Sequence, residues 1–510
     1  MAGRVGRSEG PWPWLAAGSV ALSLLLLLAL LTLLAVRGLG HFWPAPLALV
    51  TLEDGQRLAG RAVHEESVPG GEARERLYFT GNRDLAGDIW TWVPVAEIAS
   101  RAFPEELVVL ERRRWGAFLG RLVALEGEAG RREGQAAWPA LQARLAELEA
   151  LRGERDRLRE AVVTPLVRRL ERGPDAAAEA ELARANARIR ELQADMAGDT
   201  LVLESVDGRR LTQPLEEVLR ALRPNAMSPV DKLATWGREV WRFLSEGPRA
   251  ANSAGGVWPA IFGTVLMVLL MSVVVTPFGV LAGIYLNEVA HQGRFTHLVR
   301  IAVRNLAGVP SIVYGVFGLG VFVYGIGGTL DEWFFAESLP SPTFGTGGLL
   351  WASLTLALLT LPVVIVATEE GLARVPDHQR EGALALGATR VEMLTRVVLP
   401  MTAPAMLTGM ILAVARAAGE VAPLMLVGVA KLAPQVPVDG DFPYLHLDRK
   451  FMHLGYHIYD LAFHGGDVQA AMPLVYATAL LLVLVILVLN LTAIFLRHHL
   501  RARHGALPRH

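Results

Sequence analysis

Long apolar runs alternate with polar segments along the chain, and six of the runs are long enough to cross a bilayer. A membrane-spanning helix needs about 20 mostly apolar residues, because each residue advances the helix by only about 1.5 Å. The six predicted spans are residues 15–36, 260–286, 303–327, 349–368, 403–430 and 473–496. The pattern therefore predicts a helical protein that crosses the membrane several times.

Basic residues beside these runs predict their orientation, because short cytoplasmic loops carry an excess of Lys and Arg. The basic flanks are Arg4, Arg7, Arg294, His297, Arg300, Arg374, Arg380, Arg390, Arg396, Arg497, Arg501 and Arg503. All of them fall on one side if both termini are cytoplasmic, which places the polar region 38–255 outside. No clear cleavage site follows the first run, so we expect it to remain as an anchor.

The polar region between the first two runs predicts strands and a helical hairpin. Residues 47–58 and 201–212 each indicate a strand, an Asp-Gly turn and a second strand. Apolar residues at helical spacing in residues 104–197 predict two helices that pack as a coiled coil and reverse near Gly173 and Pro174. These apolar positions are Leu141, Leu145, Leu148, Leu151, Leu182, Ile189, Leu192 and Met196. A small β unit split by this hairpin would be either a platform for an outside partner or a solvated spacer.

Composition agrees with a membrane protein that has a sizeable polar domain. Hydrophobic residues make up 52% of the 510 residues, and the formal net charge of −1 gives no reason to expect nucleic acid as a partner. The chain has no cysteine, which excludes disulfides and thiolate metal sites. The histidines lack the spacing of a zinc site, so we expect no metal.

Motifs for catalysis are missing from the sequence. It contains no G-x-x-x-x-G-K-[ST] phosphate-binding loop, and neither a nucleophile elbow nor a pair of catalytic carboxylates stands out. We therefore expect no catalytic residue, no cofactor in this chain and no enzymatic activity of its own.

The segment between the fourth and fifth runs carries the most informative motif. It begins Glu381-Gly-Ala-Leu-Ala-Leu-Gly387 and, after nine further residues, ends Val-Val-Leu-Pro400. This spacing predicts a short helix up to Leu386, a sharp turn at Gly387 and a second helix over 391–398. Pro400 can open the next span because its missing N–H costs little there.

This motif resembles the EAA loop of ABC-transporter permeases, with Gly382 where the family usually has Ala. The resemblance implies a coupling loop, residues 370–400, that docks on a separate ATP-hydrolysing subunit. The residues it assigns to coupling are Glu381, Ala383, Gly387, Leu399 and Pro400. The alternative is an ordinary amphipathic connector between two spans.

Two charged residues lie inside the fifth run. Arg416 and Glu420 are four residues apart, which places them on one face of a helix. An arginine at mid-bilayer costs roughly 2.5–3.5 kcal/mol, so we expect Arg416 to face a partner or a water-lined path. Because the guanidinium matches an oxyanion, we predict that Arg416 guides an anion and that Glu420 sets a gate. The alternative is a structural ion pair between helices.

Four further residues are candidates for the pathway or its gating. Arg304 and Asn305 are predicted to begin the third span, where they either line the inner mouth of a path or snorkel to the membrane boundary. Pro277 in the second span and Pro310 in the third each remove a backbone donor, which predicts either a gating hinge or a static kink.

From residue 256 to the end, the chain resembles the PstA-type permeases of the phosphate-specific ABC importer, in an extended variant. The matching segments are residues 256–264, 279–288, 304–315, 368–370 and 415–423. The resemblance implies an all-α type I ABC importer (MetI-like) permease core with six transmembrane helices, plus an extracytoplasmic domain of β structure and a coiled coil. It implies four parts: 1–37 with the first helix, 38–255 outside, 256–500 as permease domain, and 501–510 as cytoplasmic tail.

The resemblance also implies partners and a location. They are a homologous PstC-like permease, a PstB-like ATPase dimer that binds the ATP, a PstS-like phosphate-binding protein, inorganic phosphate and the bacterial inner membrane. The alternatives are a PstC-like sister subunit, a permease for molybdate or sulfate, or a membrane-anchored scaffold or sensor.

Overall fold

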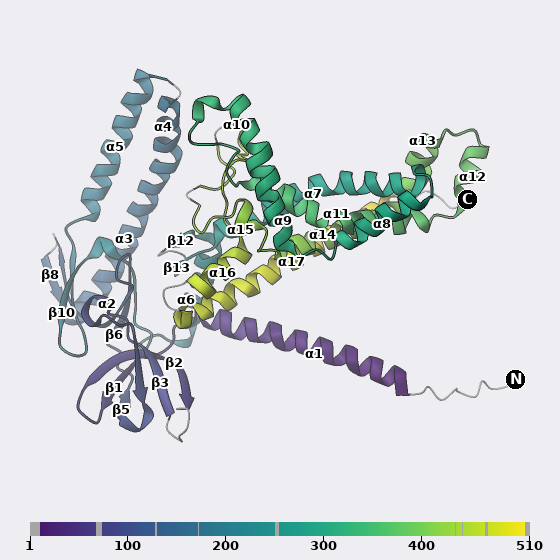
Figure 1. Ribbon diagram of the computed structural model, residues 1–510. Coiled ribbons are helices and arrows are strands. Elements are labelled where there is room, and N and C mark those ends of the chain that lie inside the picture. Colours follow the sequence, from purple (N-terminus) through teal and green to yellow (C-terminus); the bar gives the residue numbers. More distant parts are fainter. Residues whose placement is uncertain are drawn as a thin grey trace. The chain divides into compact units, whose positions relative to one another are not determined.

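The computed structural model describes most of the chain, and the described residues are 11–67, 74–127, 130–171, 173–249, 254–433, 435–440, 442–464 and 468–504. Two compact units are present: Met1–Phe42 together with Glu239–His510, and Trp43–Arg238 (Figure 1). The predicted cytoplasmic residues Arg4 and Arg7 lie outside the described residues, as does most of the predicted tail 501–510.

The unit Trp43–Arg238 contains two antiparallel sheets, so its β structure is larger than the small unit that the sequence predicted. The first sheet has the order β4-β3-β2-β1-β5. Its strands are β1 (Ala48–Leu52), β2 (Arg57–Ser67), β3 (Arg74–Phe79), β4 (Trp90–Pro94) and β5 (Ile98–Ala102). The second has the order β10-β9-β7-β6-β11, with β8 paired to β7. Its strands are β6 (Leu107–Arg112), β7 (Ala117–Gly127), β8 (Gly130–Glu133), β9 (Thr200–Glu204), β10 (Arg210–Pro214) and β11 (Val218–Leu222).

The two predicted Asp-Gly hairpins are both present, one in each sheet. In the first sheet Val50 pairs with Leu58, and in the second Leu203 pairs with Leu211. Each sheet also closes in the same way, with a short 3₁₀ turn before its last strand, η1 (Val95–Glu97) before β5 and η4 (Leu215–Glu217) before β11. The two halves of the β structure therefore repeat one local design.

A helical hairpin is inserted between β8 and β9. It consists of α3 (Ala137–Leu158), the π-helical η3 (Arg159–Val163), α4 (Thr164–Glu171) and α5 (Ala176–Met196). Asp175 caps α5 by accepting hydrogen bonds from Ala177 N and Ala178 N. The predicted helical region began too early, at residue 104, because the segment up to residue 133 forms β6, β7 and β8.

The base of this hairpin belongs to the core of the second sheet. Leu141, Leu145 and Leu148 of α3 pack with Phe118 and Leu201. Farther out, Arg188 of α5 forms an ion pair with Glu154 of α3 at 2.8 Å. Helical spacing of the leucines marked an apolar face correctly, but it could not identify the sheet as the partner of that face.

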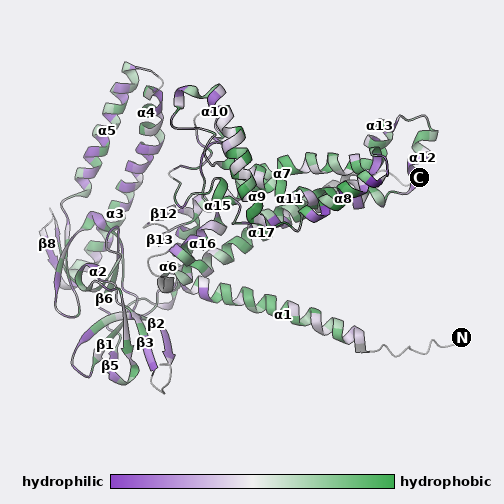
Figure 2. Cartoon of the chain, viewed as in Figure 1, coloured by the Kyte–Doolittle hydropathy of each residue, from purple (hydrophilic) through white to green (hydrophobic). Residues whose placement is uncertain are grey.

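Among the described residues, six helices are long and apolar enough to cross a membrane. They are Trp12–Gly40, Trp258–Val289, Ser311–Phe334, Leu349–Ala373, Arg390–Gly419 and Ala471–His499. Figure 2 shows hydrophobic residues along α1 (Pro11–Gly40), α7 (Trp258–Ile284) and α17 (Val468–His504), in contrast to the largely hydrophilic α4 and α5. Six predicted spans are thus matched by six candidate spans.

The third candidate span starts later than predicted. Helix α8 (Arg294–Leu306) ends before it, and Pro310 is extended, with ψ 134°. The span then runs through α9 (Ser311–Phe317), the π-helical η7 (Gly318–Gly327) and α10 (Gly328–Phe334). The predicted range 303–327 had merged the end of α8 with this span, because the apolar run continues across the break.

The fifth candidate span starts earlier than predicted and also ends earlier. It joins α13 (Arg390–Met393), the π-helical η9 (Leu394–Val398) and α14 (Leu399–Gly419). Glu420 is extended, and the short helix α15 (Leu424–Val427) follows. Pro423 has no N–H to donate to Gly419 O, so a helix that continued through it would lose this hydrogen bond. Glu420 therefore lies just after the helix that carries Arg416, not inside it.

Helix α11 (Leu349–Ala373) is the centre of the membrane unit, packed between α7 and α14. Two glycines of α7 let it approach closely: a Cβ on Gly279 would lie 2.6 Å from Val364 Cγ1, and one on Gly283 would lie 2.8 Å from Thr368 Cβ. The unit also contains η6 (Tyr285–Val289), η8 (Ala336–Ser338), α12 (Asp377–Ala385) and α16 (Leu454–His464). The linking segment before α7 includes α6 (Pro229–Ser245) and the pair β12 (Pro248–Arg249) and β13 (Ala254–Gly255).

Candidate functional site

The predicted coupling segment forms two helical pieces joined by a tight turn. Helix α12 ends at Ala385, and Gly387 has a φ of 89°, which is the left-handed region that favours glycine. Thr389 then begins the next helix with a capping box, since its hydroxyl accepts from Glu392 N while Glu392 accepts from Thr389 N. The turn therefore lies where the sequence predicted it.

The tip of this segment carries apolar side chains that face solvent. Leu386 is 91% exposed and Val391 is 68% exposed, and Leu384 is exposed as well. Glu381 is also exposed, while Ala383 packs beside Leu372, Val375, Met393 and Val398. An apolar tip on a fixed turn is typical of a surface that another protein covers.

Of the other two coupling candidates, Leu399 is partly buried and Pro400 is exposed. Pro400 occupies the first turn of α14, but the helix already runs from Arg390, so it does not open a new one.

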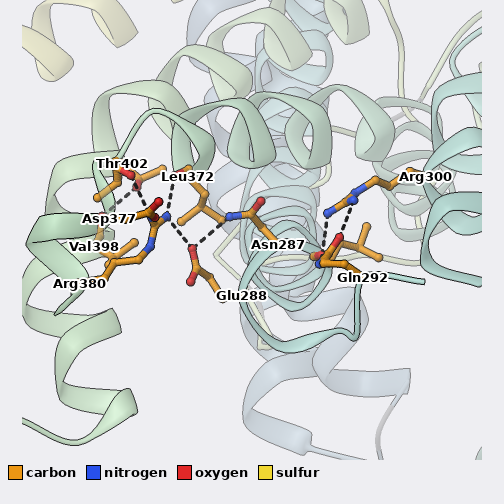
Figure 3. A network of polar contacts seen from close by, with 11 residues as sticks. Asn287, Glu288, Gln292, Arg300, Leu372, Asp377, Arg380, Val398 and Thr402 are labelled. Carbon is orange, nitrogen blue, oxygen red and sulfur yellow. Dashed lines mark hydrogen bonds and ion pairs between the residues drawn. The ribbon is translucent and has the colours of Figure 1, made fainter. Parts of the chain in front are cut away.

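Arg380 fixes α12 to the ends of the membrane helices. Its guanidinium donates to Leu372 O at 2.8 Å, in the last turn of α11, and to Val375 O at 2.6 Å, two residues after this helix ends. It also donates to Glu288 Oε1 at 2.9 Å and to Asp377 Oδ1 at 3.1 Å. Figure 3 shows Arg380 pointing toward Glu288, which lies in η6 at the end of α7.

Arg300 forms a second link between the same elements. From α8 it donates to Glu369 Oε1 of α11 and to Leu286 O, each at 2.8 Å. It also donates to Gln292 Oε1 at 2.8 Å (Figure 3). Segment 286–292 is thus held by two arginines, and both arginines also bind α11. We call Arg380, Glu288, Arg300 and Glu369 the coupling clamp. These four side chains connect α12 and α8 with α11 and with the segment that follows α7.

Arg416 and Glu420 form a much looser pair. The distance from Arg416 Nε to Glu420 Oε1 is 3.6 Å, which is an ion pair but longer than a hydrogen bond. The Arg416 side chain is 33% exposed. Within the described part of the chain, Glu420 is the one carboxylate within ion-pair distance of Arg416. Much of the guanidinium fork is therefore available to another ligand.

Two membrane helices are broken near this pair, and the elements that follow the breaks pack against each other. Glu420 begins the extended stretch after α14, and Pro310 forms the break before α9. The two regions are in contact, because a Cβ on Gly315 would lie 2.6 Å from Pro423 Cα. Broken helices within a membrane expose backbone polar groups, and they are tolerated where they line a water-filled cavity or are buried in protein.

Arg304 and Asn305 end α8 and do not begin the third span, which corrects the prediction. Both are exposed. The Tyr314 hydroxyl donates to Leu306 O at 2.7 Å and so holds the end of α8 against α9. Pro277 lies inside a continuous α7 and does not break it. The pathway and hinge roles of these residues remain predictions.

Comparison with known proteins gives the family. A family model described as "Binding-protein-dependent transport system inner membrane component" matches residues 275–504. "Phosphate transport system permease protein PstA 1" of Mycobacterium tuberculosis is 32% identical over 269 residues, which are 52% of this chain and 78% of that protein. This chain belongs to the PstA-type permeases. PstA of Yersinia pestis is 33% identical over 258 residues, 50% of this permease and 77% of that protein.

A solved structure also resembles the permease. A chain of the MetNI methionine ABC transporter, in an inward-facing conformation, is similar with a TM-score of 0.33 and 15% sequence identity. The similar region covers 54% of this permease and 99% of that chain.

Family membership confirms the predicted class. The protein is a multi-pass inner-membrane permease subunit with a MetI-like fold, and it is not an enzyme, because the ATPase of such importers is a separate subunit. An ATPase and a substrate-binding protein are the general partners of this family.

Sequence reasoning missed the coupling clamp. Arg380 and Arg300 were noted only as basic flanks, and their partners Glu288 and Glu369 lie 92 and 69 residues away. The signal that could have found them is charge at the ends of the spans, since Glu288 and Glu369 are acidic residues beside basic loops. The exposure of Leu386 and Val391 was missed because the spacing of the motif placed them in two short helices without indicating which side chains face solvent.

Proposed function

We propose that this permease forms one half of the translocation pathway for phosphate in an ATP-driven importer. The partners would be a PstC-like permease, a PstB-like ATPase dimer that binds the ATP, and a PstS-like binding protein that delivers inorganic phosphate. The observation that carries the proposal is the weakly paired Arg416 beside two helix breaks, in a chain similar to permeases named for phosphate transport.

The chemistry of this pair suits an oxyanion that must bind and then leave. Arg416 offers free donors to phosphate, while Glu420 restores local charge balance when the path is empty. A binding site for transport must be weak enough to release its ligand, and a 3.6 Å ion pair exchanges partners at low cost. Arg304 and Asn305 at the neighbouring break would extend the polar lining.

Coupling would use the tip of the segment around Gly387. The exposed Leu386, Leu384 and Val391 would enter an apolar groove of the ATPase, and the exposed Glu381 would meet a basic group at its rim. Closure of the ATPase dimer would then move α12. The coupling clamp would pass this movement to α7 and α11, and Pro277 and Pro310 are the candidate hinges.

In this proposal both termini are cytoplasmic and residues 38–255 are periplasmic. The absence of cysteine allows a direct test, because a single introduced cysteine is the only labelling site. We expect Leu386→Cys to react with an impermeant maleimide only after the cell membrane is opened, and Asp207→Cys to react from the periplasm. Labelling of Leu386→Cys from outside would overturn both the orientation and the coupling role.

The substrate is tested by uptake in cells that depend on this importer. Radiolabelled phosphate uptake should be suppressed by excess unlabelled phosphate and unaffected by sulfate or molybdate. Uptake of labelled sulfate or molybdate through the complex, with phosphate failing to compete, would overturn the phosphate assignment. Unchanged phosphate uptake on deletion of the chain would favour a scaffold.

A further inference from the structure

Helix α6 (Pro229–Ser245) exposes an apolar stripe along its whole length. The stripe consists of Val230, Leu233, Ala234, Gly237 and Trp241, which follow at steps of one, three or four residues and so share one helical face. Val230 is 75% exposed, Leu233 58% and Trp241 69%. These are large side chains to leave in water, and they are contiguous.

The opposite face of α6 already has its packing partners. Thr235 and Phe243 are buried, and Phe243 packs in a cluster that includes Val257 and Ala260 at the start of α7. Arg238 lies on the exposed polar flank of the stripe and donates to Thr235 Oγ1 at 3.1 Å. The stripe is therefore a second apolar face, in addition to the face that attaches the helix to the protein.

The end of α6 is fixed at the point where a membrane span begins. Val257 N donates to Phe243 O at 2.8 Å, and Trp258 N donates to Glu246 O at 3.1 Å. Trp258 is the first residue of α7, and its side chain is 48% exposed. On the same side, Phe42 follows the end of α1 by two residues and packs on Phe243, with ring centroids 5.1 Å apart. Two spans thus reach the membrane boundary at this end of α6.

We propose that α6 lies in the interface of the membrane, with its apolar stripe between the lipid headgroups and the acyl chains. Such helices combine one strongly apolar face with low overall hydrophobicity, and tryptophan favours this depth. Trp241 and Trp258 then belong to one aromatic belt. Lipid fits better than a protein partner because the end of α6 is hydrogen-bonded to the first residues of α7, a helix long and apolar enough to enter the bilayer.

The orientation of α6 makes the proposal testable. The stripe extends over 12 residues from Val230 to Trp241, and its two ends are about 16 Å apart along the helix. If α6 lies flat, all stripe positions have the same depth. If it projects away from the membrane, only Trp241 touches lipid. Either result is independent of what the permease transports.

The experiment uses the full chain in lipid nanodiscs, with single cysteines in the cysteine-free background. The positions are Val230→Cys, Leu233→Cys, Gly237→Cys and Trp241→Cys, with Arg238→Cys on the polar flank and Ala183→Cys on α5 as a water-exposed reference. Each is labelled with an environment-sensitive fluorophore and quenched either by lipids brominated on the acyl chains or by aqueous iodide. All labelled positions are exposed, so folding should be preserved, and gel filtration checks it.

We expect bromolipid quenching at all four stripe positions to agree within about twofold, as for an interfacial helix of constant depth. Iodide quenching there should be severalfold below that at Ala183→Cys, with Arg238→Cys intermediate. Bromolipid quenching that falls steadily from Trp241→Cys to Val230→Cys would overturn the flat orientation. Labels shielded from both quenchers would show that protein covers the stripe and would also overturn the proposal.

Discussion

The membrane unit contains two arginine sites that differ in how completely they are bonded. Arg380 in the coupling clamp donates to two backbone carbonyls and two carboxylates, and its side chain is 17% exposed. Among the described residues Arg416 has one ion-pair partner, at 3.6 Å, and its side chain is 33% exposed. The donors of Arg380 are bonded within the fold, whereas Arg416 keeps donors free.

This difference indicates two roles: Arg380 positions the helices around it, whereas Arg416 can bind a ligand. An arginine whose donors are mostly bonded fixes the elements around it, because removing it leaves several acceptors without partners. An arginine with one weak partner contributes little to the fold, so its retention in a membrane helix needs another reason. We therefore expect substitutions at the two sites to impair different properties of the permease.

Arg416→Ala should have the largest effect on transport. Hydrogen bonds to charged groups are worth about 1.5–3 kcal/mol, so phosphate uptake should fall roughly 10- to 100-fold. Thermal unfolding and co-purification with the ATPase should change little, because the ion pair with Glu420 is loose. Uptake is measured with radiolabelled phosphate.

Arg416→Lys is the matched control, since it keeps the charge but loses the fork. We expect it to retain more uptake than Arg416→Ala. Equal uptake by wild type and Arg416→Ala would contradict a pathway role, and loss of the folded complex would favour the structural ion pair.

Arg380→Ala should lower transport about tenfold while ATP hydrolysis continues, which is uncoupling and not loss of binding. The loss of contacts between partly buried groups should also cost about 1–3 kcal/mol of stability. The two activities are measured together in proteoliposomes. Arg396→Ala should behave as wild type, since Arg396 is 79% exposed and its ion pair with Glu392 spans 3.9 Å.

Exchanging the charges sharpens this test. Arg380→Glu combined with Glu288→Arg restores the ion pair but not the bonds to Leu372 O and Val375 O. Coupling should therefore recover in part. No recovery would assign the effect to the carbonyl bonds alone, and full recovery would assign it to the ion pair.

Acid should destabilise the region beside Arg416 more than the coupling clamp. Burial lowers the pKa of His453 to about 3 and that of His457 to about 4, with Asp460 partly opposing the shift of His457. A Cβ on Gly455 would lie 2.6 Å from Val421 Cγ2, which places the start of α16 beside the residue that follows Glu420.

The direction in which stability changes with pH follows from proton uptake by the unfolded chain. Both histidines are neutral in the folded protein, while the unfolded chain takes up protons below about pH 6.5. Their contribution to stability is complete above that pH and is lost as the pH falls toward 4, by about 1.4 kcal/mol per pH unit for each histidine. Thermal unfolding between pH 7.5 and 5.5 measures it. His453→Gln with His457→Gln should flatten the pH dependence, whereas His297→Gln at an exposed site should not.

Gly387→Ala should give the smallest effect, and it tests the geometry of the coupling tip. A left-handed φ costs a residue with a side chain about 1–2 kcal/mol, so transport should fall a few-fold. No atom lies within 4 Å of a Cβ at this position, so strain and not a clash is the cause. Gly382→Ala in α12, also with open space, should be neutral or stabilising by about 0.5–1 kcal/mol. Equal effects of the two substitutions would contradict a special role for the turn.

Local features of this fold were predictable from the sequence. The turn at Gly387 and the two Asp-Gly hairpins depend on backbone preferences of a few neighbouring residues, and they lie where the sequence placed them. The six apolar runs were found because span length follows from bilayer thickness.

Contacts between distant residues were not predictable. Nothing in the spacing of Glu288 and Arg380 indicates that they pair, and the leucine stripe of α3 does not reveal that a sheet covers it. The start of the third span was misplaced because hydropathy continues across the break at Pro310, where only backbone geometry changes.

The helical hairpin of the Trp43–Arg238 unit joins a base and a tip with different constraints. Leu141, Leu145 and Leu148 at the base close the core of the second sheet, so shortening the hairpin there would uncover that core. Beyond the ion pair of Glu154 with Arg188, the two helices have mainly each other as neighbours. Whole helical turns could be removed from or added to this outer part without altering the sheet. The length of the hairpin can therefore change while the sheet that carries it keeps the same fold.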